Sequence, residues 1–491
     1  MPENNRRLEN NLRLVAELRR ASAGWRDRVR ALPVAPELGK AELVERLRRY
    51  DFAAPVPLDA LADDVADLLA HGTLHATHPR YFGLFNPTSH AAGAVADALA
   101  AIYNPQVGGW WHAPAANEIE RAVLDWLLAR AGLDPARAAG TFTTGGAEAN
   151  LTAVLVALAR HFPTCADDGV AGLERRPTLY ASDQAHDSFV KIAHATGLGR
   201  RAVQRVASDE RRRLDVAALA ERIARDRRAG RAPFLVVATA GTTATGAIDP
   251  LPAIADLCAA EGLSLHVDAA WGGCALLSGA LRHHLAGIER ADTITWDAHK
   301  TLPVPMGAGM ILARDGGALA APFHVQTAYV PDARADGVDL YQASMQWSRR
   351  AIGLKVFMTI AELGAPGIAA LVEHQASMAD LLRGELAAAG WTVRNDSPLP
   401  IVCFGRGELA PSGERVPELV EAVVAGGAAW LSEVRQPSGE SLLRACITNV
   451  ETGPDDVRAL VAALGRGLDQ VRASAALRRA RLSAGHSAPA S

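Results

Sequence analysis

Between about residues 140 and 315, short apolar runs alternate with stretches in which hydrophobic residues recur at helical spacing. The runs are typical of buried strands, because they are brief, rich in aliphatic residues and bounded by turn-forming residues. They cover residues 178–182, 234–240, 263–268, 293–297 and 308–313. This alternation predicts parallel βαβ units, and therefore an α/β fold with a mostly parallel central sheet between helices.

Other patterns lie on either side of this region. Leu, Val and Ala recur among charged residues over 1–75, which predicts helices. Two further helices are predicted at 346–363 and 367–389. A smaller α+β region follows, with strands at 400–404, 429–434 and 442–448 and a helix at 455–467. The end of the chain is rich in Ala, Ser and Arg, so we expect it to be frayed or disordered.

The length of 491 residues allows two or three domains, and a hydrophobic content of 49% supplies a sizeable core. We expect four parts: an N-terminal helical segment (1–75), a large α/β domain (76–375), a small C-terminal α+β domain (376–470) and a disordered tail (471–491).

Charge and cysteine content argue against several classes of protein. The net charge of −3 provides no general attraction to nucleic acid. The five cysteines are widely spaced and form no CxxC pair, which argues against a disulfide framework and a zinc cluster. The N-terminus lacks an apolar signal core, and no run of about 20 uncharged apolar residues occurs. We therefore expect a cytoplasmic protein without a metal site, and no binding to membranes or nucleic acid.

Candidate chemistry lies at the ends of two predicted strands. Lys300 follows the strand at 293–297 in the run TITWDAHK, and Asp268 ends the strand at 263–268. Ligand sites of parallel sheets collect at the carboxyl ends of strands, and a lysine sheltered from water can attack a carbonyl group. Taken alone, such patterns more often belong to a solvated lysine and a strand-capping carboxylate.

Three motifs together resemble the group II pyridoxal-phosphate (PLP) amino-acid decarboxylases, the family of aromatic-amino-acid and glutamate decarboxylases. They are TTGGAEAN (143–150), LSLHVDAAWGG (263–273) and TITWDAHK (293–300), and the similarity extends from about 81 to 452. The resemblance implies a PLP-dependent transferase fold of type I and a homodimer with shared active sites, in which the N-terminal segment wraps the other subunit. It also implies removal of the α-carboxyl group of an L-amino acid as CO2, which leaves the amine.

The resemblance also implies a set of cofactor-binding residues. Lys300 would tether PLP covalently, Asp268 would pair with the ring nitrogen, and His186, in the run SDQAH, would stack on the ring. Where Asp297 stands, animal aromatic decarboxylases carry Asn, which argues against a phosphate contact there. The expected cofactor-binding set is Gly145, Gly146, Ala147, His186, Thr242, Thr243, Asp268, Ala270, Asp297, His299 and Lys300. The resemblance leaves open which of the two threonines contacts PLP.

Two further residues bear on the reaction. Tyr329 matches a mobile-loop tyrosine that protonates Cα after CO2 leaves, so the expected catalytic residues are Lys300, Tyr329, His186 and Asp268. Arg444 matches an arginine that meets the substrate α-carboxylate in glutamate decarboxylases. A packed loop tyrosine and a structural ion pair are the competing interpretations.

The substrate side chain is less well defined. Phe85, Asn86 and Trp110 match pocket segments of the family, and their character favours an aromatic or bulky neutral amino acid. The pair Arg349–Arg350 leaves an acidic substrate open, namely glutamate, aspartate or cysteine sulfinate. The resemblance is also compatible with decarboxylation of 2,4-diaminobutyrate, with an aldehyde synthase and with a non-catalytic PLP-binding homologue.

Overall fold

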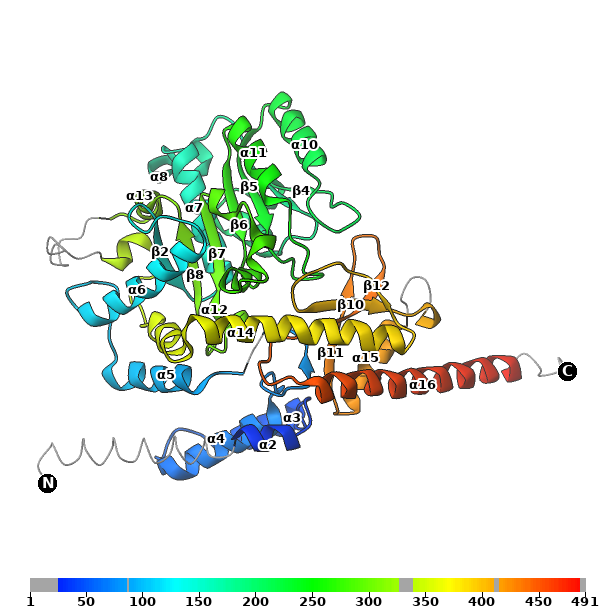
Figure 1. The fold of residues 1–491 in the computed structure, drawn as a ribbon. Helices are drawn as coiled ribbons and strands as arrows, with labels where there is room; N and C mark the ends of the chain where they lie inside the picture. The colour runs from blue at the N-terminus through cyan, green and yellow to red at the C-terminus, as the bar shows by residue number, and fades with distance from the viewer. Residues whose placement is uncertain (1–24, 86–87, 326–338, 410–414, 486–491) are drawn as a thin grey trace, which may run out of the picture.

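The computed structural model describes residues 25–85, 88–325, 339–409 and 415–485 (Figure 1). Two expected site residues, Asn86 and Tyr329, lie outside these ranges. The described N-terminal part consists of helices, as the sequence predicts: α2 (Trp25–Ala31), α3 (Lys40–Leu47) and α4 (Leu58–Gly72). They lie together on one side of the molecule, below the large sheet in Figure 1.

Within the described residues, the large sheet has seven strands in the order β2-β8-β7-β6-β5-β3-β4. These are β2 (Ala139–Thr143), β3 (Pro177–Ser182), β4 (Val203–Val206), β5 (Ala232–Thr239), β6 (Ser264–Asp268), β7 (Thr293–Asp297) and β8 (Gly309–Ala313). Only β8 runs antiparallel to its neighbours, so the prediction of a mostly parallel sheet is confirmed. The sequence pattern missed β2 and β4, which are short and mix polar with apolar residues.

Helices cover both faces of this sheet (Figure 1). Alternate residues of β5 point to opposite faces: Leu235 and Val237 belong to a core cluster with α7 and α9, and Val236 and Ala238 to one with α10 and α11. This double covering is why the strands read as continuous apolar runs. The helices of this part are α5 (Ala91–Tyr103), α6 (Pro114–Arg130), α7 (Gly146–His161), α8 (Cys165–Asp168), α9 (Ser188–Ala195), α10 (Val216–Arg228), α11 (Leu251–Glu261), α12 (Ala298–Thr301) and α13 (Gly316–Ala320).

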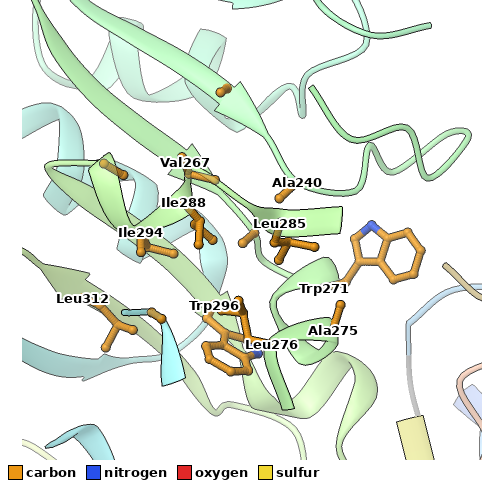
Figure 2. Close-up of a cluster of buried hydrophobic side chains, with 14 of the residues drawn as sticks. Ala240, Val267, Trp271, Ala275, Leu276, Leu285, Ile288, Ile294, Trp296 and Leu312 are labelled. Carbon is orange, nitrogen blue, oxygen red and sulfur yellow. The ribbon is translucent and has the colours of Figure 1, made fainter. Parts of the chain in front are cut away.

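The core below the carboxyl ends of β6 and β7 contains two buried tryptophans, Trp271 and Trp296 (Figure 2). Two glycines after β6 allow this packing. A Cβ atom on Gly272 would lie 2.0 Å from the Ala240 carbonyl oxygen, and one on Gly273 would lie 2.8 Å from the Trp296 ring. The turn after β6 therefore packs closely against the end of β5 and against β7. This packing fixes the position of Trp271 at the carboxyl edge of the sheet.

The small sheet has the order β1-β11-β12-β10-β9. Its strands are β1 (Tyr81–Phe82), β9 (Thr392–Val393), β10 (Ile401–Gly405), β11 (Trp430–Arg435) and β12 (Ser441–Cys446), and the helices beside it are α15 (Val416–Ala425) and α16 (Pro454–Gly485). The sequence-based division placed residue 81 in the large domain, but β1 pairs with β11 of the small sheet. A separate apolar cluster forms the core of this part.

The two helices predicted at 346–363 and 367–389 form one element, α14 (Gly353–Ala388), which is interrupted at Gly364 (φ 64°). The predicted start at 346 is wrong, because Arg349 is tied to the preceding segment: its backbone N–H donates to Gln106 and its carbonyl accepts from Val107. By length and composition alone, α14 could cross a membrane. It packs against α5, α6 and α16 within the structure.

The end of the chain also differs from expectation. We predicted a helix ending at 467 and disorder from 471, but α16 continues to Gly485. Val471 is buried against the small-domain core, and the Ala-, Leu- and Arg-rich sequence that follows has high helix propensity. The helix therefore extends past its packed part.

Candidate active site

The carboxyl ends of β5, β6 and β7 surround a cavity that contains the two residues predicted at strand ends. Lys300 lies in the single turn α12 directly after β7, and Asp268 is the last residue of β6. Asp268 pairs in register with Thr295, so the two strands end side by side. The cavity is lined by Gly146, Ala147, Asn150, His186, Thr239, Gly241, Thr243, Asp268, Ala270, Trp271 and Lys300. Most of the expected cofactor-binding residues therefore share one site.

Asp268 is buried and held by two neutral donors. Its Oδ2 accepts from Asn150 Nδ2 at 2.9 Å, and its Oδ1 accepts from the Ala270 backbone N–H at 3.1 Å. Hydrogen bonds to the charged form stabilise a carboxylate in a buried environment. The structure thus places an acceptor group in the cavity wall, bonded to Asn150 of α7.

The N-terminus of α7 approaches the site through glycines. A Cβ atom on Gly146 would lie 2.8 Å from Asp297 Oδ2, and one on Gly309 would lie 2.5 Å from Gly145 Cα. Gly145 itself has room, because its Cβ atom would meet only His299 Cε1 at 3.7 Å. The unsatisfied backbone N–H groups of a helix N-terminus favour an anion, so this turn suits a phosphate group.

Asp297 and His299 flank Lys300. Asp297 is 1% exposed, and its Oδ2 lies 3.1 Å from Lys300 Nζ, whereas neither carboxylate oxygen accepts a hydrogen bond from the described residues. His299 Nδ1 accepts from the Ala308 backbone N–H at 3.1 Å. Burial lowers the pKa of His299, with the Asp297 carboxylate acting in the opposite direction. Lys300 therefore has one buried carboxylate beside it and a neutral imidazole next to it in sequence.

Of the two threonines after β5, the structure brings only Thr243 to the cavity. Thr242 is buried within its own loop, where its hydroxyl bonds Thr245 and accepts from the Ala247 N–H. The Thr242 side chain therefore does not line the cavity, and the expectation that it binds the cofactor stays a prediction. His186 lines the same cavity, and its Nδ1 accepts from the Ser188 N–H at the start of α9, which orients the ring.

Arg444, on β12 of the small sheet, reaches the site from the other side. It is 3% exposed and donates to the carbonyl oxygens of Gly83 (2.8 Å) and Thr243 (3.1 Å). Its Nη2 has no hydrogen-bond partner among the described residues. Arg444, His186 and Thr243 also line an adjoining cavity of about 560 Å³. The guanidinium thus keeps one buried donor available beside the Lys300 cavity.

Phe85 links the two sides of the site. Its ring stacks on Trp271 at 4.7 Å between centroids, with Arg444 Cζ at 5.2 Å and Lys300 Nζ at 5.9 Å from its centroid. Trp110, in contrast, does not line this cavity. Its indole N–H donates to Glu118 and its backbone N–H to Asp339, which fix it elsewhere in the chain.

Sequence reasoning missed Asn150 and His266, which lie behind Asp268. Two features of the sequence could have identified them. Asn150 is a polar residue directly after TTGGAEA in an otherwise apolar helix, and His266 lies two positions before Asp268, on the same face of the strand. Another cavity, of about 770 Å³, lies away from the Lys300 site and shares none of its lining residues. Within the described ranges, no group of three or more His, Cys, Asp or Glu residues could hold a metal ion.

Comparisons with known proteins agree with this geometry. The model of the pyridoxal-dependent decarboxylase conserved domain matches residues 47–406. An aromatic-L-amino-acid decarboxylase of Bacillus atrophaeus is 31% identical over 392 residues, which cover 78% of this chain and 80% of the relative. An L-2,4-diaminobutyrate decarboxylase of Rhizobium meliloti (strain 1021) is 38% identical over 340 residues, which cover 67% of this chain and 66% of the relative.

Among solved structures, Oryza sativa TDC with PLP and tryptamine matches with a TM-score of 0.88 at 26% identity, covering 96% of this chain and 99% of that chain. A family model that matches most of the chain, together with a relative above 30% identity, establishes the family of this protein. The chain belongs to the pyridoxal-dependent decarboxylase family and is a PLP-dependent amino-acid decarboxylase.

Proposed function

We propose that this decarboxylase acts on an L-amino acid with an aromatic or bulky neutral side chain and releases CO2 and the amine. The observation that carries the proposal is the Phe85–Trp271 stack, which forms an aromatic wall within 5.9 Å of Lys300 Nζ. Such a wall favours a planar or bulky apolar group over a charged one, because a charge in an apolar site loses hydration.

The residues of the site fit PLP. Lys300 supplies the amine for the covalent tether, Asp268 the carboxylate for the ring nitrogen, and the Gly145–Gly146 turn the anion-binding end. The crowding at Gly146 and Gly309 supports the assignment, since side chains there would displace the turn. Bound PLP supplies the sink for the electron pair of the bond that is broken at Cα.

The side chains around the substrate determine which bond at Cα is broken. We propose that Arg444 Nη2 binds the α-carboxylate and turns it toward His186, which lies on the same cavity wall. A charged donor suits a carboxylate, and holding that group in one orientation would favour loss of CO2 over loss of the Cα proton. Tyr329, outside the described residues, is proposed to return a proton to Cα.

The experiment is CO2 release by the PLP-loaded enzyme from separate amino acids. L-tryptophan, L-phenylalanine, L-tyrosine and L-dihydroxyphenylalanine test the aromatic proposal, and glutamate, aspartate, cysteine sulfinate and L-2,4-diaminobutyrate test its rivals. Turnover of an aromatic substrate with the highest kcat/KM is the expected result. The 38% identical diaminobutyrate decarboxylase favours one rival, so preferential release from L-2,4-diaminobutyrate would replace the aromatic assignment. Oxygen consumption with peroxide release would instead indicate an aldehyde synthase.

We also propose a homodimer. Helix α4 leaves Leu58, Val65 and Leu69 exposed by 56%, 43% and 58%, and their spacing of seven and four residues places them on one helical face. A contiguous exposed apolar face marks an interaction surface, and a second copy would cover it. Sedimentation should give twice the 51.7 kDa chain mass, and Leu69→Asp should shift the enzyme toward the monomer. A wild-type monomer at micromolar concentration would contradict the proposal.

A further inference from the structure

A chain of buried polar side chains runs behind Asp268, away from the cavity. Asn150 Nδ2 donates to Asp268 Oδ2 at 2.9 Å, and Asn150 Oδ1 lies 3.1 Å from His266 Nε2. His266 Nδ1 lies 2.9 Å from Thr293 Oγ1. These four residues, which we call the Asp268 support chain, are each at most 5% exposed.

The sheet geometry explains why these groups meet. His266 and Asp268 are two residues apart on β6, so their side chains point to the same face. Thr293 is the register partner of His266 on β7, and α7, which carries Asn150, packs against both strands. The contacts therefore join three elements through one layer of side chains.

The donor and acceptor roles in the support chain follow from one another. Asn150 Nδ2 faces two oxygens, Asp268 Oδ2 and Ser188 Oγ (3.1 Å), so this side of the amide is the donor side. Its Oδ1 then faces His266, which has to donate from Nε2. A neutral imidazole with its proton on Nε2 accepts at Nδ1, and the Thr293 hydroxyl is the donor placed there.

Burial keeps this imidazole neutral. It lowers the pKa of His266 from 6.5 to about 4, although the nearby Asp268 carboxylate raises it. A second hydroxyl, Thr295 Oγ1, lies 3.4 Å from His266 Nε2, and the ring edge packs 6.0 Å from Phe189 between centroids. The groups that contact the ring are hydroxyls, an amide and an aromatic ring, so burial decides its protonation state and His266 is an uncharged link.

We propose that Asn150 and His266 are positioning residues that hold the Asp268 carboxylate correctly oriented for the cofactor ring nitrogen. The inference rests on the proposed role of Asp268. If the Asn150 amide were reversed, its oxygen would face the Asp268 carboxylate and repel it. The Nε2–H of His266 prevents that reversal, because the reversed amide would place two donors against each other. Thr293 in turn keeps the proton on Nε2.

The test compares PLP binding by purified full-length variants. Asn150→Leu removes the donor to Asp268 with little change of volume, and His266→Leu removes the group that orients the amide. We expect the dissociation constant of PLP to rise about ten- to hundredfold in both, as for loss of a hydrogen bond to a charged group, with a changed absorption band of the bound cofactor. His266→Gln keeps a donor that reaches Asn150 and should restore affinity to within about threefold of wild type.

Ser188→Ala is the matched control, because it removes the other acceptor of Asn150 Nδ2 and leaves the Asp268 contact in place. It should bind PLP as wild type does. The PLP-induced increase in Tm is measured for each protein, which separates weakened cofactor binding from a general loss of stability. Wild-type affinity and spectrum in both Asn150→Leu and His266→Leu would overturn the inference. Unaltered PLP binding in Asp268→Asn would instead overturn the proposed role of Asp268, a result that the same titration distinguishes.

Discussion

Arg444→Lys tests directly how the substrate carboxylate is held. The Arg444 guanidinium already donates to the carbonyl oxygens of Gly83 and Thr243, and Nη2 remains for a ligand. Lysine keeps the charge but carries a single nitrogen on a flexible stem, which cannot reproduce the planar fork. The substitution should therefore both remove the bond to the ligand and leave one carbonyl oxygen unsatisfied.

The magnitude follows from these contacts. A hydrogen bond to a charged group contributes about 1.5–3 kcal/mol, so its loss should lower kcat/KM by roughly tenfold to 150-fold. A buried carbonyl left without a donor costs about 1–3 kcal/mol, which should lower the free energy of unfolding by a similar amount. Activity and stability should thus both fall, for separable reasons.

Binding of an amino acid and of its amine distinguishes the two effects. L-Tryptophan and tryptamine are the first pair, because they differ only in the α-carboxylate. Arg444→Lys should weaken binding of the amino acid tenfold or more and leave binding of the amine within about twofold. Ser432→Ala removes the 3.3 Å contact to Arg444 Nη1 and the 3.4 Å bond from the serine hydroxyl to the Arg444 carbonyl oxygen, but leaves Nη2 untouched; it is the control and should affect neither. Equal weakening of both ligands would refute carboxylate recognition by Arg444.

Three further predictions concern the proton donor, the glycine cradle and acid stability. Tyr329→Phe should retain PLP binding but reduce amine formation relative to CO2 release, and an unchanged amine yield would remove its proposed role. Gly309→Ala, whose Cβ would lie 2.5 Å from Gly145 Cα, should weaken PLP binding and destabilise the fold by about 1–3 kcal/mol, whereas Gly384→Ala, with open space around it, should do neither. Since the folded pKa of His266 is about 4 and its unfolded value 6.5, its neutral form should contribute stability that is lost as pH falls from 6.5 toward 4. Urea unfolding should therefore show a loss from pH 7.5 to pH 5 that is about 2 kcal/mol smaller in His266→Gln, and an equal loss in both proteins would contradict the buried neutral ring.

Much of the large domain could be predicted from local patterns. The strands at 234–240, 263–268 and 293–297 are buried on both faces, so each reads as an apolar run without reference to the rest of the chain. Their order with intervening helices predicts that Asp268 and Lys300 end neighbouring strands at the same edge. Local patterns were weaker where burial is partial: they missed β4 and placed the end of the last helix at 467.

The chemistry of the site needed the tertiary structure, because it depends on contacts between residues far apart in the chain. The pairing of β1 with β11, Arg444 reaching Gly83 across 361 positions, and the choice of Thr243 over Thr242 leave no local pattern. Periodicity along a strand or helix reports which face of that element is buried, since burial repeats with the backbone geometry. It does not report which side chain meets which across the core. Sequence therefore determined the order of elements and the two strand-end residues, whereas packing decided which groups surround them.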